Sequence, residues 1–231
     1  NELLGHRKGR THCLPCPGPA DQIIAPTVAP PIVRSAFNLA DHRNKNADRL
    51  IRAIGIVSRD VSDVQLELIG GGSDHSLATL KKSADRHAPG RVRFCGPIPH
   101  AQMQAVLSTS AAFALVSHRE SFGMVFAEAL LSGVPCLIPK GRAIDGYFPE
   151  GSITLSANPS NKNSIASGLL RLLQKQSDFK ARLLAHQQSG KLDFLRRDAI
   201  SQVYASALSA ASVESRVAPR SSTARRRFAP A

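Results

Sequence analysis

The chain has 231 residues, of which 42% are hydrophobic and 20% are charged, a composition typical of a folded globular protein rather than a disordered one. No run of about 18 uncharged apolar residues occurs, which excludes a membrane-spanning helix. The net charge of +13 attracts anions in general, whereas 5% aromatic residues and the absence of Trp speak against a surface that stacks nucleic-acid bases.

The two ends of the chain differ from its middle. Six of the fifteen prolines lie within residues 1–31, which we predict to be an irregular linker or the remnant of a missing N-terminal domain. Residues 213–231 are rich in Arg, Ser, Ala and Pro and are predicted to be a disordered basic tail.

Cys13 and Cys16 have the spacing of half a zinc site, but no second Cys or His pair follows at a suitable distance, so no metal is expected. Four cysteines in all, with no recognisable signal peptide, favour a reducing, cytoplasmic setting.

Between the ends, strand and helix patterns alternate. Short apolar runs predict strands that begin near Ile32, Val64, Val92, Ala112, Pro135 and Ile153. Helical patterns cover residues 47–57, 77–86, 101–107, 123–131 and 164–173, and further helices are expected near 178–188 and 194–210. We therefore predict one α/β domain over residues 32–212, built on a doubly wound parallel sheet.

In an open parallel sheet, ligands bind where strands end and helices begin, so these turns are searched first. The Gly-rich turn at residues 69–74 lets a ligand approach the backbone closely. It is not a dinucleotide fingerprint, because His75 stands at the sixth position, and it is not a phosphate loop, because no Gly-Lys-Ser/Thr follows. A plain tight turn capped by Ser73 or Asp74 is the alternative.

Residues 41–46 follow the first strand and place two cations, Arg43 and Lys45, at the start of a helix. The positive end of the helix dipole disfavours cations, so their presence indicates a bound polyanion such as a diphosphate. A solvated basic turn is the alternative.

The helix expected at residues 123–131 is apolar on every side except at Glu128, which indicates a buried helix. A carboxylate in such a helix is destabilising unless hydrogen-bond donors reach it. The donors are either a neighbouring Lys or Arg or the hydroxyl groups of a ligand. Glu120 precedes this helix, in the turn that faces the expected crevice.

Residues 120–135 resemble the E-x7-E signature of retaining GT-B glycosyltransferases, and most closely glycosyltransferase family 4 (glycosyl transferases group 1), which usually reads E-P-F-G-x-x-x-x-E-A-x-x-x-G-x-P. Other landmarks follow the order of that family. Residues 45–51 resemble its K-N-x-x-x-L-I segment, residues 66–72 its strand with a Gly-rich turn, and residues 92–99 its V-x-F-x-G-x-V-P segment. The likeness covers about residues 32–175. Ser121 stands where the family has Pro, and Leu39 and Ala40 stand where it usually has a Gly-Arg pair.

This resemblance implies the C-terminal, Rossmann-like, donor-binding half of a GT-B enzyme. Glu120 would hold the donor sugar, Glu128 would hold the ribose hydroxyls, and Lys45 would neutralise the diphosphate, with Arg43 in place of the absent Arg. Glu120 and Lys45 would carry the catalytic roles. The other donor-binding residues implied are Gly72, Ile98, Pro99, Ser121, Phe122, Gly123 and Met124.

The implied reaction transfers a sugar from a nucleotide-sugar to an acceptor glycan or lipid-linked sugar, in polysaccharide or glycoconjugate synthesis. It would retain anomeric configuration and need no metal or other cofactor. A missing N-terminal GT-B domain would complete the site, so these residues alone are expected to be inactive. The enzyme would be cytoplasmic. This location would include peripheral contact with an anionic membrane.

Two alternatives belong to other classes. One is a non-catalytic domain that binds a nucleotide-sugar or a partner and needs a separate acceptor-domain chain. The other is a nucleic-acid-binding domain, which rests on the charge alone. No specific nucleic acid is expected as a partner.

Overall fold

The computed structural model describes Ala20 and residues 22–217, with side chains as far as residue 209. The Cys13–Cys16 pair and the basic residues after 217 lie outside this part of the chain, so the predictions made for them stay predictions.

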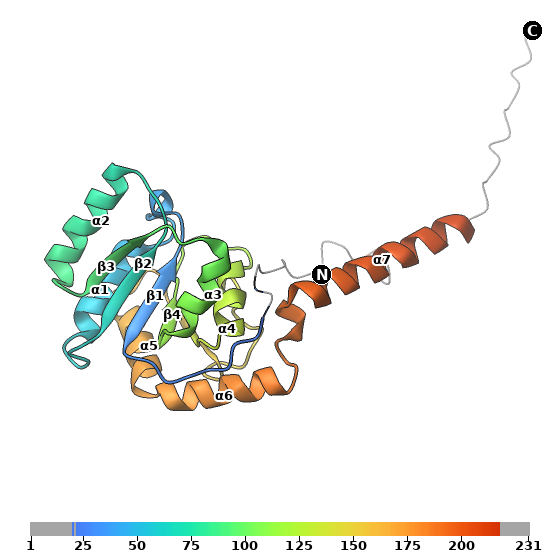
Figure 1. Ribbon diagram of the computed structural model, residues 1–231. Helices are drawn as coiled ribbons and strands as arrows, with labels where there is room; N and C mark the ends of the chain where they lie inside the picture. Colours follow the sequence, from blue (N-terminus) through green and yellow to red (C-terminus); the bar gives the residue numbers. More distant parts are fainter. Residues whose placement is uncertain (1–19, 21, 218–231) are drawn as a thin grey trace, which may run out of the picture.

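Six strands form one parallel sheet at the centre of the molecule (Figure 1). Their order across the sheet is β3-β2-β1-β4-β5-β6, the doubly wound, Rossmann-like order, so the predicted fold class is confirmed. The strands are β1 (Ile32–Ala36), β2 (Gln65–Ile69), β3 (Val92–Gly96), β4 (Ala112–Ala114), β5 (Cys136–Pro139) and β6 (Thr154–Ala157).

Helices cover both faces of the sheet, which explains why its central strands are apolar on both sides. On one face α1 packs between α2 and α5, and on the other face α3 packs beside α4. In β4, Ala112 and Ala114 belong to the core under α1 and α5, whereas Phe113 packs edge-on against Phe126 of α4 at 5.8 Å. The helices are α1 (Ala47–Val57), α2 (Asp74–His87), α3 (His100–Ser108), α4 (Met124–Leu131), α5 (Lys162–Gln174), α6 (Gln176–Gln188) and α7 (Arg197–Val217), with short turns of 3-10 helix at η2 (Leu39–Asp41) and η3 (Asp193–Leu195).

Two helices depart from their predicted bounds by three residues or more at one or both ends. Helix α2 begins three residues early, because the Ser73 hydroxyl accepts a hydrogen bond from the amide of Ser76 at 3.2 Å and caps the helix at that point. Helix α7 extends away from the body and runs to Val217 (Figure 1), so the prediction of disorder from residue 213 is wrong for residues 213–217. The sequence has neither Gly nor Pro between Arg197 and Pro219, so no local breaker ends the helix earlier.

Residues 22–31 form no helix or strand but are hydrogen-bonded to the body. The Ile24 amide donates to the carbonyl of Leu131 at 2.8 Å. Ala29 exchanges two hydrogen bonds with the side-chain amide of Gln176, at 2.7 and 3.1 Å. No helix in the described part of the chain is long and apolar enough to cross a membrane.

Candidate functional site

The strand order reverses between β1 and β4, and in open α/β sheets this is where ligands bind. The turn after β1 leads to Lys45, and the turn after β4 leads to Glu120. The topology therefore brings together two of the turns that the sequence singled out.

A pocket of about 710 Å³ opens at this end of the sheet. Its walls come from the turns after β1, β2 and β3 and from helices α3 and α4. The residues that line it are Ala36, Phe37, Asn38, Ala40, Ile69, Gly70, Gly71, Gly72, Ser73, Pro97, Ile98, Met103, Val125 and Glu128. Three of the predicted donor-binding residues, Gly72, Ile98 and Glu128, thus share one cavity.

Close packing requires two of the three glycines of this turn. Gly70 has φ +141°, and a Cβ added there would lie 1.9 Å from the carbonyl oxygen of Phe37. A Cβ at Gly72 would lie 2.7 Å from that of Leu39. By contrast, a Cβ at Gly71 would meet nothing within 4 Å. The turn therefore brings bare backbone to the pocket wall, while its last residue, Ser73, caps α2.

Glu128 is the buried carboxylate that the sequence predicted, with 5% of its surface exposed. Its Oε1 has no hydrogen-bond partner in the described structure. His100 Nε2 lies 3.6 Å away, beyond a normal hydrogen bond. Burial raises the pKa of Glu128, and His100 opposes that shift. No Lys or Arg among the described residues forms an ion pair with it, so the first of the two predicted kinds of donor is not found in this part of the chain.

Lys45 and Glu120 form an ion pair at the end of the sheet where β1 and β4 finish, with Lys45 Nζ 2.9 Å from Glu120 Oε2. Neither residue lines the pocket itself. The two turns are also joined through Asn44, which accepts from the His118 amide at 2.7 Å and, by its side chain, from the Arg119 amide at 3.0 Å. These bonds hold Lys45 next to Glu120.

Asn46 fixes the start of α1. Its backbone is left-handed, with φ 59°, and its side chain donates to the carbonyls of Val116 at 3.1 Å and Pro159 at 2.7 Å. A small side chain with two donors tolerates this conformation and satisfies two carbonyls at the ends of strands.

The N-terminus of α4 carries four of the predicted residues. Gly123 has φ +74°, and a Cβ there would lie 2.5 Å from the Phe126 ring. Phe122 is buried, with its ring 5.7 Å from that of Tyr147, whereas Ser121 and Met124 are exposed. Helix α4 begins here without a side-chain cap. Backbone amides at such a helix start attract anions.

Eight of the eleven predicted donor-binding residues do not line this pocket: Lys45, Glu120, the four residues at the start of α4, Pro99 and Arg43. Pro99 is exposed and precedes α3, although its neighbour Ile98 lines the pocket. Arg43 lines a different hollow, between α1 and α2. The structure therefore does not bring Arg43 together with Glu128.

Several residues near the site were missed by the sequence reasoning. His100 faces Glu128, and Phe37 and Met103 line the pocket. Their position just after β1 or in the helix after β3 was the available signal, because strand ends meet at one edge of the sheet.

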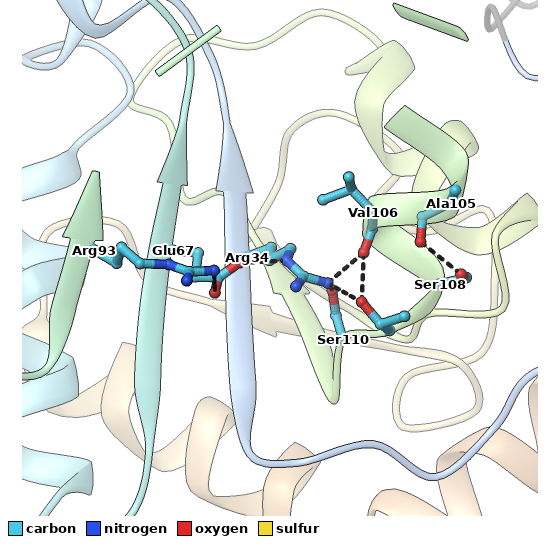
Figure 2. A network of polar contacts seen from close by, with 8 residues as sticks. Arg34, Glu67, Arg93, Ala105, Val106, Ser108 and Ser110 are labelled. Carbon is cyan, nitrogen blue, oxygen red and sulfur yellow. Dashed lines mark hydrogen bonds and ion pairs between the residues drawn. The ribbon is translucent and has the colours of Figure 1, made fainter. Parts of the chain in front are cut away.

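A charge network across the sheet, buried at Arg34 and Glu67, was also missed (Figure 2). Arg34 Nε donates to Glu67 Oε2 at 2.7 Å, and Arg93 pairs with the other carboxylate oxygen. The Arg34 Nη1 group reaches the Thr109 hydroxyl at 2.7 Å and the carbonyl of Val106. The network thus joins β1, β2 and β3 to the end of α3, a helix that forms one wall of the pocket.

Among the described residues, no group of three or more His, Cys, Asp or Glu side chains is placed to hold a metal ion. The prediction that the reaction needs no metal stays a prediction.

The strand order and the crevice define a Rossmann-like domain with a pocket at the end of the sheet where the strand order reverses. Over residues 36–188 the sequence matches the model of the family described as glycosyl transferases group 1, and the chain belongs to that family. The N-acetyl-alpha-D-glucosaminyl L-malate synthase of Bacillus anthracis is 26% identical over 132 residues, which are 57% of this chain and 34% of that protein.

Solved glycosyltransferase structures share the fold. S. aureus TarM, solved with fondaparinux, alpha-GlcNAc-glycerol and UDP, has a TM-score of 0.64 at 17% identity, covering 79% of this chain and 36% of that one. Anabaena HepE in complex with UDP has a TM-score of 0.67 at 18% identity, covering 78% and 49%. The chain spans between about a third and a half of the length of these relatives.

Proposed function

We propose that this chain binds a nucleotide-sugar and serves as the donor-binding half of a retaining glycosyltransferase. The observation that carries the proposal is Glu128, whose Oε1 is buried without a donor at the wall of a pocket of about 710 Å³. A buried acceptor left unpaired is destabilising, and the two hydroxyls of a ribose are donors that would satisfy it. The volume lies within the range of small-molecule sites.

The rest of the pocket suits the parts of such a donor. Apolar side chains at Ile98 and Met103 would pack on the base, and the bare backbone at Gly71 leaves room for the ribose and its first phosphate. UDP is the first nucleotide to test, because S. aureus TarM and Anabaena HepE were each solved in complex with it.

Charge around the pocket suits a departing diphosphate. Lys45 and the backbone amides at the start of α4, which no side chain caps, would stabilise the negative charge that develops as the sugar leaves, while Glu120 would hold the sugar hydroxyls. Transfer would proceed with retention and without a metal. We assign the catalytic roles to Glu120 and Lys45 and name no nucleophile.

The acceptor would be a glycan or a lipid-linked sugar, in polysaccharide or glycoconjugate synthesis. The pocket opens at the sheet edge, so a second GT-B domain across that edge would bring the acceptor to the donor sugar. We place the reaction in the cytoplasm, with peripheral contact to an anionic membrane where the acceptor is lipid-linked.

Isothermal titration of the purified chain with UDP-, GDP- and ADP-sugars tests this proposal. We expect weak binding of at least one donor and an affinity about tenfold lower in Glu128→Ala, the loss expected for a hydrogen bond to a charged group. Glu150→Ala is the matched control, because this carboxylate is exposed, accepts hydrogen bonds from Ser156 and does not line the pocket. Equal affinities in the two variants would contradict the assignment.

A further inference from the structure

Three hollows, of about 270, 640 and 160 Å³, open on the outer side of α1, towards α2 and the start of α5. All three include Asp48, and none shares a residue with the proposed donor pocket. The three hollows are therefore adjacent, and together we call them the basic groove. The cationic side chains that line it are Arg43, Arg49, Arg52, Lys82, Arg86 and Lys162.

One carboxylate, Asp48, faces these six cations, and it is already paired. It accepts hydrogen bonds from Arg52 Nε at 2.7 Å and from the Ser83 hydroxyl at 2.5 Å. Burial alone would raise the pKa of Asp48, but these two bonds together hold it below its ordinary value. Of the six cations of the groove, Asp48 thus forms an ion pair with Arg52 and with no other. The cations of the groove that have no ion pair with any described residue are Arg43, Arg49, Lys82, Arg86 and Lys162.

Three of the cations are close enough to act on one histidine. The pKa of His87, at the end of α2, is lowered by burial and then by the charges of Arg52, Arg86 and Lys162. These three side chains come from α1, α2 and α5, so the charge converges from three elements that are distant in sequence.

The residues that line the basic groove limit the class of anion that it can bind. The large hydrophobic side chains that are exposed in the described structure lie outside α1, α2 and α5, so the groove has no apolar group to insert into a bilayer. No aromatic residue lines it except His42 and His87, so it has no platform for nucleic-acid bases. Four of the six cations are Arg, whose planar guanidinium binds phosphate through two parallel hydrogen bonds.

Four of the cations form two rows, one along α2 and one along α1. Lys82 and Arg86 are one turn apart on α2, and Arg49 and Arg52 are one turn apart on α1. We propose that the basic groove binds a flexible chain of phosphate groups, at a site separate from the donor pocket. A single phosphate would leave most of these charges unpaired, whereas a chain lying along the groove meets both rows.

The test uses the full chain, with binding of fluorescently labelled inorganic polyphosphate followed by anisotropy. The groove variant is Lys82→Gln, Arg86→Gln and Lys162→Gln combined. The matched control is Arg59→Gln, Lys175→Gln and Lys191→Gln, which removes the same charge from exposed positions outside the groove. We expect the groove variant to bind about tenfold or more weakly with a shallower salt dependence, and the control to change less than about twofold.

Equal losses in the two variants would overturn the proposal, because the binding would then follow net charge. Duplex DNA or vesicles of anionic lipid that bind as tightly as polyphosphate would also overturn it. UDP binding provides an independent readout: the groove variant should bind UDP as the unaltered chain does. If neither protein binds UDP, the proposed function fails while the groove result still stands.

Discussion

Lys45 and Glu120 form an ion pair, Nζ to Oε2 at 2.9 Å, across the point where the strand order of the sheet reverses. One residue follows β1 and the other follows β4, 75 positions later. Their side chains keep 21% and 13% of their surface exposed, so a ligand can reach both. In the proposed donor complex, Lys45 would turn to the diphosphate and Glu120 to the sugar. The pair thus holds two opposite charges ready for two parts of one ligand.

Substitutions of Lys45 and Glu120 should affect the binding of the nucleotide and the binding of the sugar differently. Lys45→Met should weaken UDP binding about tenfold, because a charge-assisted hydrogen bond to phosphate is lost. Glu120→Gln should leave UDP affinity unchanged or slightly raised, since Lys45 is released, yet weaken the UDP-sugar. Isothermal titration with both ligands measures this difference. Lys175→Met serves as the control, and a Glu120→Gln effect of equal size on both ligands would refute the assigned role.

Glu128 should make the protein less stable as pH rises. Burial raises its pKa in the folded state, so the folded protein binds more protons than the unfolded one between the two pKa values, and stability falls across that interval. Glu128→Gln should therefore be the more stable protein at pH 7, by about 1 kcal/mol. Its advantage should vanish below about pH 4, where the carboxyl is protonated in both states. Urea unfolding at several pH values measures this, and an advantage that is constant with pH would contradict it.

Lys180 should have the opposite effect, at higher pH. Its ammonium is buried and donates to the carbonyl of Ser110 at 2.8 Å. Burial lowers the pKa of Lys180 to about 8, and the nearby Cys136 opposes this shift. The unfolded chain therefore binds more protons between pH 8 and 10.5, so stability should rise over this interval relative to Lys180→Met, by about 2–3 kcal/mol at most. Thermal unfolding of both proteins from pH 7 to 10.5 measures this difference in stability. Curves of stability against pH that stay parallel for the two proteins would contradict the prediction.

The network at Arg34 should be sensitive to the loss of one partner. Arg34→Met leaves Glu67 buried and only partly paired, which should destabilise the domain by about 3–5 kcal/mol. The double variant with Glu67→Leu should recover much of that loss, because no buried charge is left uncompensated. Arg52→Met is the control: it removes an exposed pair on α1 and should cost about 0.5 kcal/mol or less. Urea unfolding distinguishes these values, and a double variant as unstable as the single one would refute the explanation.

The elements with the strongest hydrophobic periodicity were predicted most accurately. Helix α1 has the predicted bounds, and Leu50, Ile51 and Ile54 are fully buried as one face. The same patterning predicted that Glu128 is buried, because its helix is apolar around it. Boundaries set by single hydrogen bonds were predicted less well: a cap at Ser73 was one of the alternatives, yet the helix was predicted to begin at residue 77, about one turn late.

Contacts between distant residues could not be predicted in this way. Nothing near Arg34 indicates that Glu67 and Thr109 will satisfy it, and nothing near Arg43 indicates that it will turn away from the pocket. Such pairs depend on which strands become neighbours and in what register.

The sequence by itself determined the alternation of strands and helices, the buried position of Glu128 and the family landmarks, because hydrophobic spacing and turn chemistry are local properties of a chain. Only the tertiary structure decided that Lys45 meets Glu120, that Glu128 Oε1 remains without a donor, and that the cations of α1, α2 and α5 share one groove. The physical reason is that electrostatic and hydrogen-bond partners are chosen by distance in space, which the packing of the sheet and its helices sets.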